Sequence, residues 1–293
     1  MNLFKTVGFI GVGIMGKSMV RNLMKHDYEV HIYARHPQKV QDVVGEGAIL
    51  HPNLAEAVAD RDVVFTVVGG PNDVEDLYLR SGGILDSAKE GAFLIDMTTS
   101  SPSLAKKIHD KGKAMGFHVL DVPVTGGDIG ARNATLSLLA GGDRDDYEKA
   151  RELLLCLGNN LNYEGPSGCG QHTKAVNQIM VAASLAGMCE GFAYAKVNGL
   201  DLKTVLSSVA SGAAGSRSLD LYADRLIAGD MQPGGALKFL VKDLKIAREG
   251  LVDSGIRLKA MEQILEEYQQ MVDEGLGDLG TQALYEFCLR KRQ

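Results

Sequence analysis

The chain of 293 residues lacks tryptophan altogether and is poor in cysteine and proline, with four and seven residues. No two cysteines form a CxxC pair, and no Cys/His group has the spacing of a zinc site. This pattern predicts a reduced protein with buried or inert thiols and no metal site. The four cysteines are Cys156, Cys169, Cys189 and Cys288.

An excess of basic charge and a long apolar run are also absent. The 31 Lys and Arg against 37 Asp and Glu give a net charge of −6, which is not typical of a nucleic-acid binder. The longest uncharged stretch of the second half, residues 175–189, is shorter than the roughly 20 residues of a membrane-spanning helix. The apolar N-terminal segment is interrupted by glycines, which favours a strand and a turn over a signal peptide. We expect a cytoplasmic protein that binds neither nucleic acid nor membrane.

Glycine, in contrast, is abundant at 35 residues, and the first half alternates short apolar runs with helical patterns. Helices are expected over residues 14–26, 54–59 and 102–115, and strands over residues 6–10, 29–34, 62–68, 92–97, 118–124, 135–140 and 160–163. Nearly continuous apolar strands are typical of a parallel sheet that is buried on both faces. The repeated βαβ pattern predicts an α/β, Rossmann-type doubly wound domain over residues 1–165.

The second half shows no convincing strand, and we expect an all-α domain over residues 166–293, entered by a long interdomain helix over residues 171–198. That helix is apolar on nearly every side between residues 179 and 188, which predicts burial. Ala183, Gly187 and Gly191 recur every four residues, so another helix could approach closely; the alternative is a flexible weak point, because glycine costs roughly 1 kcal/mol per helical site. Further helices are expected over residues 202–211, 216–228, 236–254 and 258–275, and a last one to the basic end at Arg290, Lys291 and Arg292.

A GxGxxG motif follows the first strand and opens the first helix, which is the context that dinucleotide binding requires. Gly11 permits the tight turn, Gly13 lets the backbone approach a pyrophosphate, and Gly16 lets the helix pack on the strand. Because the helix N-terminus faces the phosphates, the expected cofactor site also includes Val12, Ile14 and Met15. The alternative is a glycine-rich turn without a ligand.

The end of the second strand indicates which dinucleotide is used. NAD-binding folds usually carry Asp or Glu there, but this strand ends Ile-Tyr-Ala-Arg-His without an acidic residue. Arg35 lies 19 residues after Gly16 and suits a 2′-phosphate, so NADP is the expected cofactor. His36 or Lys39 could assist, and the alternative is an arginine that is merely solvated.

Further motifs resemble those of the β-hydroxyacid dehydrogenases, a family that includes 3-hydroxyisobutyrate dehydrogenase, tartronate semialdehyde reductase and glyoxylate/succinic semialdehyde reductase. Residues 8–16 are similar to the family's GFIGLGxMG, and residues 121–131, DVPVTGGDIGA, to its DAPVSGGxxGA. Residues 168–178, GCGQHTKAVNQ, resemble GxGxxxKxxN, and residues 242–244 match its KDL. The four motifs occur in order and the resemblance covers essentially the whole chain.

The resemblance implies that Lys174 is catalytic and that Thr125, Gly126 and Gly127 bind a substrate carboxylate. A lysine ammonium can supply both a proton and a positive charge to a developing alkoxide. Asn177 stands three residues after Lys174 on one helical face and would orient the lysine or bind the substrate. Exposed amides of a Gly-Gly turn can hold a carboxylate, although the turn could also need glycine for its geometry alone.

The remaining expected site residues come from shorter matches. Thr99 ends a segment similar to the family's DxST and should lie near the nicotinamide and the substrate. Pro71 closes a cofactor turn, Lys242 is expected to bind the cofactor, and Asp243 to bind the substrate. Gly235 stands where many members carry a Phe that lines the substrate pocket, so the substrate preference stays open.

The function expected from these residues is the NADPH-dependent reduction of a small carboxylate-bearing aldehyde, or the reverse oxidation. One alternative is an imine reductase on the same scaffold, against which Lys174 argues because those enzymes usually replace it. Another is a non-catalytic NADP-binding sensor, which has no need of a proton donor. The family resemblance also implies a homodimer or a homotetramer.

Overall fold

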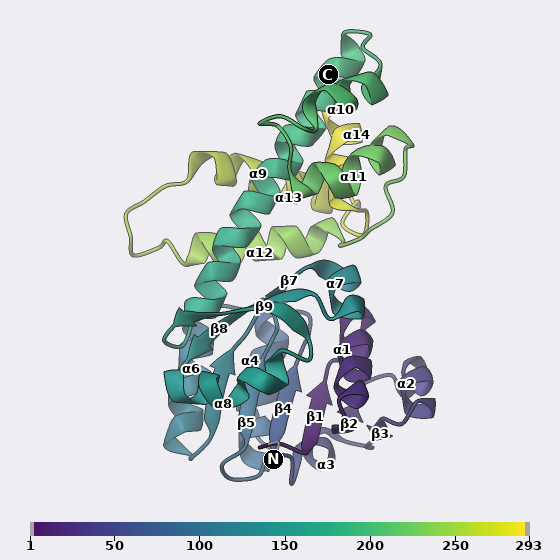
Figure 1. Ribbon diagram of the computed structural model, residues 1–293. Coiled ribbons are helices and arrows are strands. Elements are labelled where there is room, and N and C mark those ends of the chain that lie inside the picture. The colour runs from purple at the N-terminus through teal and green to yellow at the C-terminus, as the bar shows by residue number, and fades with distance from the viewer. Residues whose placement is uncertain (1–2, 291–293) are drawn as a thin grey trace. The chain divides into compact units, whose positions relative to one another are not determined.

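The computed structural model describes residues 3–290, and its contacts divide the chain into two units, Met1–Lys174 and Ala175–Gln293 (Figure 1). Unit 1 holds a sheet flanked by helices and unit 2 is helical, so the expected Rossmann-type domain followed by an all-α domain is confirmed. The division falls inside the long helix α9 (Cys169–Val197). The domain boundary at residue 165 stays a prediction.

A nine-stranded sheet forms the centre of unit 1, with the order β3-β2-β1-β4-β5-β6-β8-β7 and with β9 paired to β8. The first six strands in this order, from β3 through β1 to β6, are parallel to one another. Strand β8 runs antiparallel to β6 and β7 and parallel to β9. Their bounds are β1 (Thr6–Ile10), β2 (Glu29–Tyr33), β3 (Ile49–Leu50), β4 (Val63–Thr66), β5 (Phe93–Asp96), β6 (His118–Asp121), β7 (Val124–Thr125), β8 (Leu136–Gly142) and β9 (Gly158–Gly165).

The register aligns the carboxyl ends of the central strands. Ile10 pairs with Tyr33 on one side and with Thr66 on the other, Thr66 pairs with Asp96, and Asp96 pairs with Asp121. The loops that follow β1, β2, β4, β5 and β6 therefore leave the sheet at one edge, where ligands bind in open α/β sheets.

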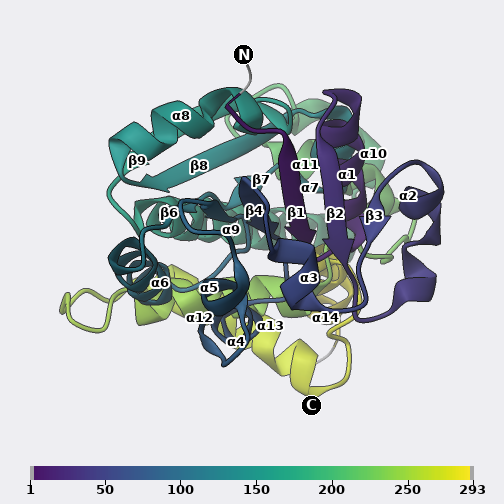
Figure 2. The same cartoon turned by 90° about the horizontal axis from the view of Figure 1, so that it is seen from below.

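Helices cover both faces of this sheet (Figure 2). One apolar cluster packs α1 and α8 against one face, and a second packs α3, α4, α5 and α6 against the other, so the sheet is doubly wound. The helices of unit 1 are α1 (Ile14–Lys25), α2 (Gln41–Gly45), α3 (Leu54–Val58), α4 (Pro71–Leu79), α5 (Ile84–Ser87), α6 (Pro102–Ala114), α7 (Gly127–Asn133) and α8 (Arg144–Leu154), with a 3₁₀ turn at Pro37–Lys39.

Unit 2 has its own apolar core, built from α9 and the helices that follow it. Leu185, Cys189 and Phe192 of α9 belong to this core together with Leu244 of α12 and Tyr268 of α13. The helices are α10 (Leu202–Val209), α11 (Arg217–Ile227), α12 (Leu237–Glu249), α13 (Lys259–Asp273) and α14 (Leu284–Cys288), with a 3₁₀ turn at Thr281–Ala283. Lys291 and Arg292, part of the expected basic end, lie outside the described residues.

One expectation about burial was wrong. Helix α9 is not buried on every side: Met180 is 65% exposed, and an added Cβ at Gly187 or Gly191 would meet nothing within 4 Å. The core of unit 2 covers one face of this helix, which leaves the small-residue face open. Of the thiols, Cys156 and Cys189 are buried, but Cys288 is exposed. Within residues 3–290, no helix is long and apolar enough to cross a membrane.

Candidate active site

The turn between β1 and α1 has the shape of a pyrophosphate cradle. A Cβ at Gly11, where φ is +102°, would lie 2.0 Å from Val67 O, and one at Gly16 would lie 2.1 Å from Gly11 O. A Cβ at Gly13 would meet nothing within 4 Å, so this glycine borders open space. Helix α1 begins at Ile14 without a side-chain cap, which leaves its N-terminal amides to an anion. These residues fit a dinucleotide.

The side chains between these glycines divide by exposure. Val12 is buried and Met15 packs against the core, whereas Ile14 is 79% exposed. A ligand on this turn would therefore meet the backbone of Val12 and Met15 and not their side chains.

Beside the end of β2, the expected NADP determinant has an acidic neighbour. Arg35 is 75% exposed, and its Nη1 lies 3.7 Å from Asp73 Oδ1 of α4. Pro71 is the first residue of that helix, so the loop that carries Pro71 also places Asp73 beside Arg35. Asp73 was missed in the sequence because it comes from a different βα unit.

A buried polar network fixes the loop that follows β5. Thr66 Oγ1 donates a hydrogen bond to Asp96 Oδ1 at 2.7 Å, and the same oxygen accepts one from Thr98 N at 3.1 Å. Thr98 Oγ1 in turn accepts from Val68 N at 3.0 Å. The loops after β4 and β5 are thereby joined, and Thr99 is the next residue of this anchored segment.

The start of α9 is tied to the carboxyl ends of β5 and β6. Asp121 Oδ1 accepts a hydrogen bond from Gly168 N at 2.8 Å, and Oδ2 accepts one from Gln171 N at 3.0 Å. The Gln171 side chain accepts from Ser100 N at 2.8 Å and donates to Thr98 O at 2.7 Å. Asp121 and Gln171 were missed as site residues; the available signal was a carboxylate in an otherwise apolar strand.

Burial sets the protonation of Asp121. The side chain is 3% exposed, and this burial raises the pKa of Asp121 to about 6, with Asp96 adding to the rise and the two backbone amides opposing it. A carboxylate in this position titrates much closer to neutral pH than an ordinary aspartate.

Lys174 lies three residues after Gln171 on α9 and is the last residue of unit 1. It is 7% exposed. Since a lysine is almost never fully buried in a globular protein unless a specific interaction holds it, burial at this position favours a functional over a solvated lysine.

The Thr125-Gly126-Gly127 segment forms an open turn. Thr125 pairs with Ser137 across β7 and β8, Gly126 and Gly127 have φ of +131° and +65°, and α7 begins at Gly127 without a side-chain cap. A Cβ at Gly127 would meet nothing within 4 Å. The turn thus needs glycine for its backbone and also leaves open space beside it.

In unit 2, side-chain contacts join three expected site residues, Asn177, Lys242 and Asp243, with Gln178 as the link between Asn177 and Asp243. Asn177 Nδ2 donates to Gln178 Oε1 at 2.6 Å, and Gln178 Nε2 donates to Asp243 Oδ2 at 2.6 Å. Lys242 Nζ lies 2.9 Å from Asp243 Oδ1. Gln178 was missed in the sequence because its link to Asp243 joins residues 65 positions apart. Gly235 is exposed, with nothing within 4 Å of an added Cβ.

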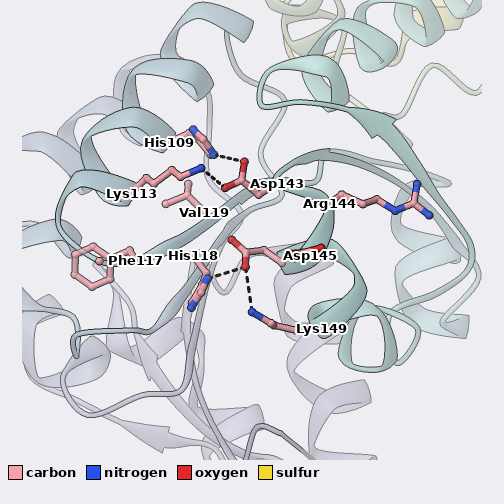
Figure 3. A pocket seen from close by; sticks show the side chains of 11 residues that line it. His109, Lys113, Phe117, His118, Val119, Asp143, Arg144, Asp145 and Lys149 are labelled. Carbon is pink, nitrogen blue, oxygen red and sulfur yellow. Dashed lines mark hydrogen bonds and ion pairs between the residues drawn. The ribbon is translucent and has the colours of Figure 1, made fainter.

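A separate hollow of about 560 Å³ lies beside the first residues of β6 and is lined by none of the expected site residues (Figure 3). His109 and Lys113 contact Asp143, and His118 Nδ1 lies 2.7 Å from Asp146 Oδ1. Its acidic and basic groups thus compensate one another. No group of three or more His, Cys, Asp or Glu side chains in residues 3–290 could hold a metal ion.

Comparison with known proteins agrees with this architecture. Residues 6–165 match the NAD binding domain of 6-phosphogluconate dehydrogenase, and residues 168–288 match the NAD-binding domain of NADP-dependent 3-hydroxyisobutyrate dehydrogenase. A probable mitochondrial 3-hydroxyisobutyrate dehydrogenase-like protein of Arabidopsis thaliana is 40% identical over 279 residues, which cover 95% of this chain and 83% of that protein.

Two further relatives carry informative names. The 2-hydroxy-3-oxopropionate reductase of Escherichia coli is 32% identical over 241 residues, 82% of each chain. The solved structure of Psf3 in complex with NADP⁺ and 2-OPP is 25% identical, with a TM-score of 0.89 over 96% of this chain and 99% of that one. Together with the two domain matches, these similarities place the chain in the β-hydroxyacid dehydrogenase family, whose members are NAD(P)-dependent oxidoreductases that act on CH–OH groups.

Proposed function

We propose that this protein reduces a small aldehyde bearing a carboxylate, such as glyoxylate or a semialdehyde, to the hydroxy acid with NADPH, or catalyses the reverse oxidation. The observation that carries the proposal is the burial of Lys174 at the start of α9, in the segment that Asp121 and Gln171 tie to the carboxyl ends of β5 and β6. A reductase needs a proton donor at this edge of the sheet, and a sensor does not.

The residues would divide the reaction as follows. A dinucleotide held on the turn from Gly11 to Gly16 would supply the hydride that the carbonyl carbon accepts. Lys174 donates its ammonium proton to the carbonyl oxygen, so that the C=O bond becomes a C–OH group and the amine is left neutral. Before the proton moves, the positive charge of the Lys174 ammonium stabilises the developing alkoxide. A proton from solvent then restores the ammonium, and Asn177 orients the lysine or the substrate.

The turn at Thr125, Gly126 and Gly127 would hold the substrate carboxylate. Two successive glycine amides, with open space beside Gly127, suit an anion, and the Thr125 methyl group disfavours branching next to it. Because Lys174 and this turn must serve one molecule, carboxylate and carbonyl cannot be far apart, which supports substrates of two to four carbons. Thr99 and Asp243 are proposed to complete the substrate site.

For the cofactor, we place the pyrophosphate on the turn from Gly11 to Gly16 and the 2′-phosphate beside Arg35. Pro71 and Lys242 are proposed as further cofactor contacts. The open space beside Gly13, the uncapped start of α1 and the lack of an acidic residue at the end of β2 support this placement.

Substitution of Lys174 tests the proton donor. The Lys174→Ala enzyme should lose about 10²- to 10⁴-fold in kcat, the usual contribution of a positioned general acid, with little change in cofactor affinity. Lys107→Ala is the matched control, because Lys107 is an exposed lysine of unit 1 and pairs only at the surface with Glu75. Near-normal turnover of a folded Lys174→Ala enzyme would exclude Lys174 as the acid.

The substrate class is tested with glyoxylate and a panel of semialdehydes, each compared with its uncharged methyl ester. Losing a charge-assisted contact worth roughly 1.5–3 kcal/mol should lower kcat/KM about 10- to 150-fold for the ester. Activity confined to imines and neutral ketones would favour the imine reductase, and cofactor binding without turnover would favour the sensor.

A further inference from the structure

The carboxylate of Asp121 is enclosed by glycine. A Cβ at Gly141 of β8 would lie 2.7 Å from Asp121 Oδ1, and one at Gly170 of α9 would lie 2.9 Å from Oδ2 and 2.6 Å from Asp121 O. Gly168, whose amide donates to Oδ1, has φ of +89°. The glycines at the start of α9 thus let the helix begin directly on this carboxylate.

Helix geometry explains why an anion is kept there. The first amides of an α-helix have no partner within the helix, and their partial positive charge favours a negative group. At the start of α9, His172 N donates to the O atom of Gly168, the residue before the helix. Asp121, from another element, accepts from Gly168 N and Gln171 N. A capping residue taken from a distant strand fixes the position of the helix as well as its stability.

We infer that Asp121 is a positioning residue of the reaction, which holds the first turn of α9 on β6 and thereby places Lys174. The inference rests on the proposed role of Lys174 as proton donor. Asp121 accepts a hydrogen bond from the backbone amide of Gln171, and Gln171 precedes Lys174 by three residues, less than one helical turn. A shift of this turn therefore reaches Lys174 directly, and a misplacement of 1 Å costs a reaction about 10²-fold.

A specific pH dependence follows. With its pKa raised to about 6, Asp121 is ionised at neutral pH and protonated in mild acid. Asp96 of β5 is the charged group that faces it, while β8 and the start of α9 contribute glycines and backbone amides. A protonated carboxyl group is a poorer acceptor for two N–H donors. The kcat for reduction should therefore fall as the pH drops through about 6.

The first experiment compares the pH profiles of the wild-type and Asp121→Asn enzymes. At pH 8 the variant should lose about 10- to 100-fold in kcat, while KM for the aldehyde and for NADPH changes less than about 3-fold. The variant should also no longer show the fall of kcat below about pH 6. Asp146→Asn is the matched control, since Asp146 is a buried aspartate of unit 1 that pairs with His118 away from α9. A folded Asp121→Asn enzyme that keeps the wild-type kcat, or that still loses kcat below about pH 6, overturns the inference.

A second experiment needs neither a variant nor turnover. Hydrogen exchange of the amides of Gly168 and Gln171 is measured in the wild-type protein at pH 5 and pH 8 and corrected for intrinsic rates. Loss of the charged acceptor should lower their protection at pH 5 about 10- to 150-fold, with other α9 amides unaffected. Equal protection at both values overturns the inference even if Asp121→Asn does not fold. If Lys174→Ala is inactive but Asp121→Asn keeps the wild-type kcat, only the positioning role of Asp121 is refuted. If Lys174→Ala is active, the proposed function is refuted.

Discussion

Arg35 and Asp73 show how two exposed residues can set a cofactor preference in opposite directions. The guanidinium of Arg35 would pair with a 2′-phosphate, but Asp73 Oδ1 lies 3.7 Å from it and would repel the same group. Such an exposed pair contributes little to stability by itself. Its effect is therefore expected in binding, where specificity depends on unfavourable contacts as well as favourable ones.

The two residues should consequently respond differently to substitution. Arg35→Ala is expected to lower kcat/KM for NADPH about 10- to 150-fold, with a much smaller effect for NADH, because a charge-assisted contact is lost. Asp73→Asn should improve the use of NADPH by removing a like charge. Arg80→Ala, which changes the residue that follows the helix of Asp73 and pairs with Asp76, serves as the control. A wild-type enzyme that already prefers NADH would refute the assignment.

At the scale of elements, the first turn of α9 depends on the absence of one side chain. A Cβ at Gly170 would lie 2.3 Å from Leu139 O and 2.6 Å from Asp121 O, and these backbone atoms cannot move aside as a flexible side chain would. Gly170→Ala should therefore lower the free energy of unfolding by about 1–3 kcal/mol, the usual effect of overpacking, and should reduce kcat.

Urea unfolding of Gly170→Ala and of Gly45→Ala measures this difference. Gly45 lies in α2 with nothing within 4 Å of an added Cβ, so its substitution should change stability by less than about 1 kcal/mol. Equal stability of the two variants would show that the start of α9 can move away from β8.

Local pattern predicted many of the long or buried elements, but it missed helices α4 and α8, which have nine and eleven residues. The continuous apolar runs of β1, β4 and β5 and the apolar face of α1 were found close to their observed bounds. The expected strand over residues 118–124 is divided around Pro123 into β6 and β7, which both pair with β8. Helices α2 and α5, with five and four residues, are too short to show a helical period.

The same distinction applies to the candidate site. The turn at Gly11–Gly16 could be predicted because its glycines, strand and helix are adjacent in the sequence. Asp121 and Gln171 could not, since their partners lie 47 to 73 positions away. Exposure on α9 was also misjudged, because an apolar sequence cannot tell which face the other helices of unit 2 cover.

For the whole molecule, the open face of α9 bears on assembly. Val176, Met180, Tyr194 and Val197 are 55–71% exposed along this helix. Their spacing of three or four residues, or multiples of it, places them with Gly187 and Gly191 on one side. Apolar side chains gathered beside small residues are unfavourable in water, and we propose that a second copy of the chain covers them in a homodimer or a homotetramer.

Light scattering after gel filtration checks this proposal. The wild-type protein should elute as a dimer or tetramer, and Met180→Glu, which would bury a charge in the interface, should shift it toward the monomer. Val252→Glu is the control, because Val252 is 77% exposed but lies beyond α12. A monomeric wild-type protein, or an equal effect of both substitutions, would contradict the proposal.

The bond pattern around Asp121 also bears on the order in which the protein folds. The links from Asp121 and from the Gln171 side chain close loops of 47 to 73 residues, so each carries a large entropy cost until the intervening chain is already compact. Contacts of high sequence separation form late in folding. The pairings of β1 with β2, of β4 with β5 and of β5 with β6 join residues only 23 to 30 positions apart. We therefore expect these strands to pair first and the first turn of α9 to dock afterwards, so that Lys174 reaches its place only after β5 and β6 have paired.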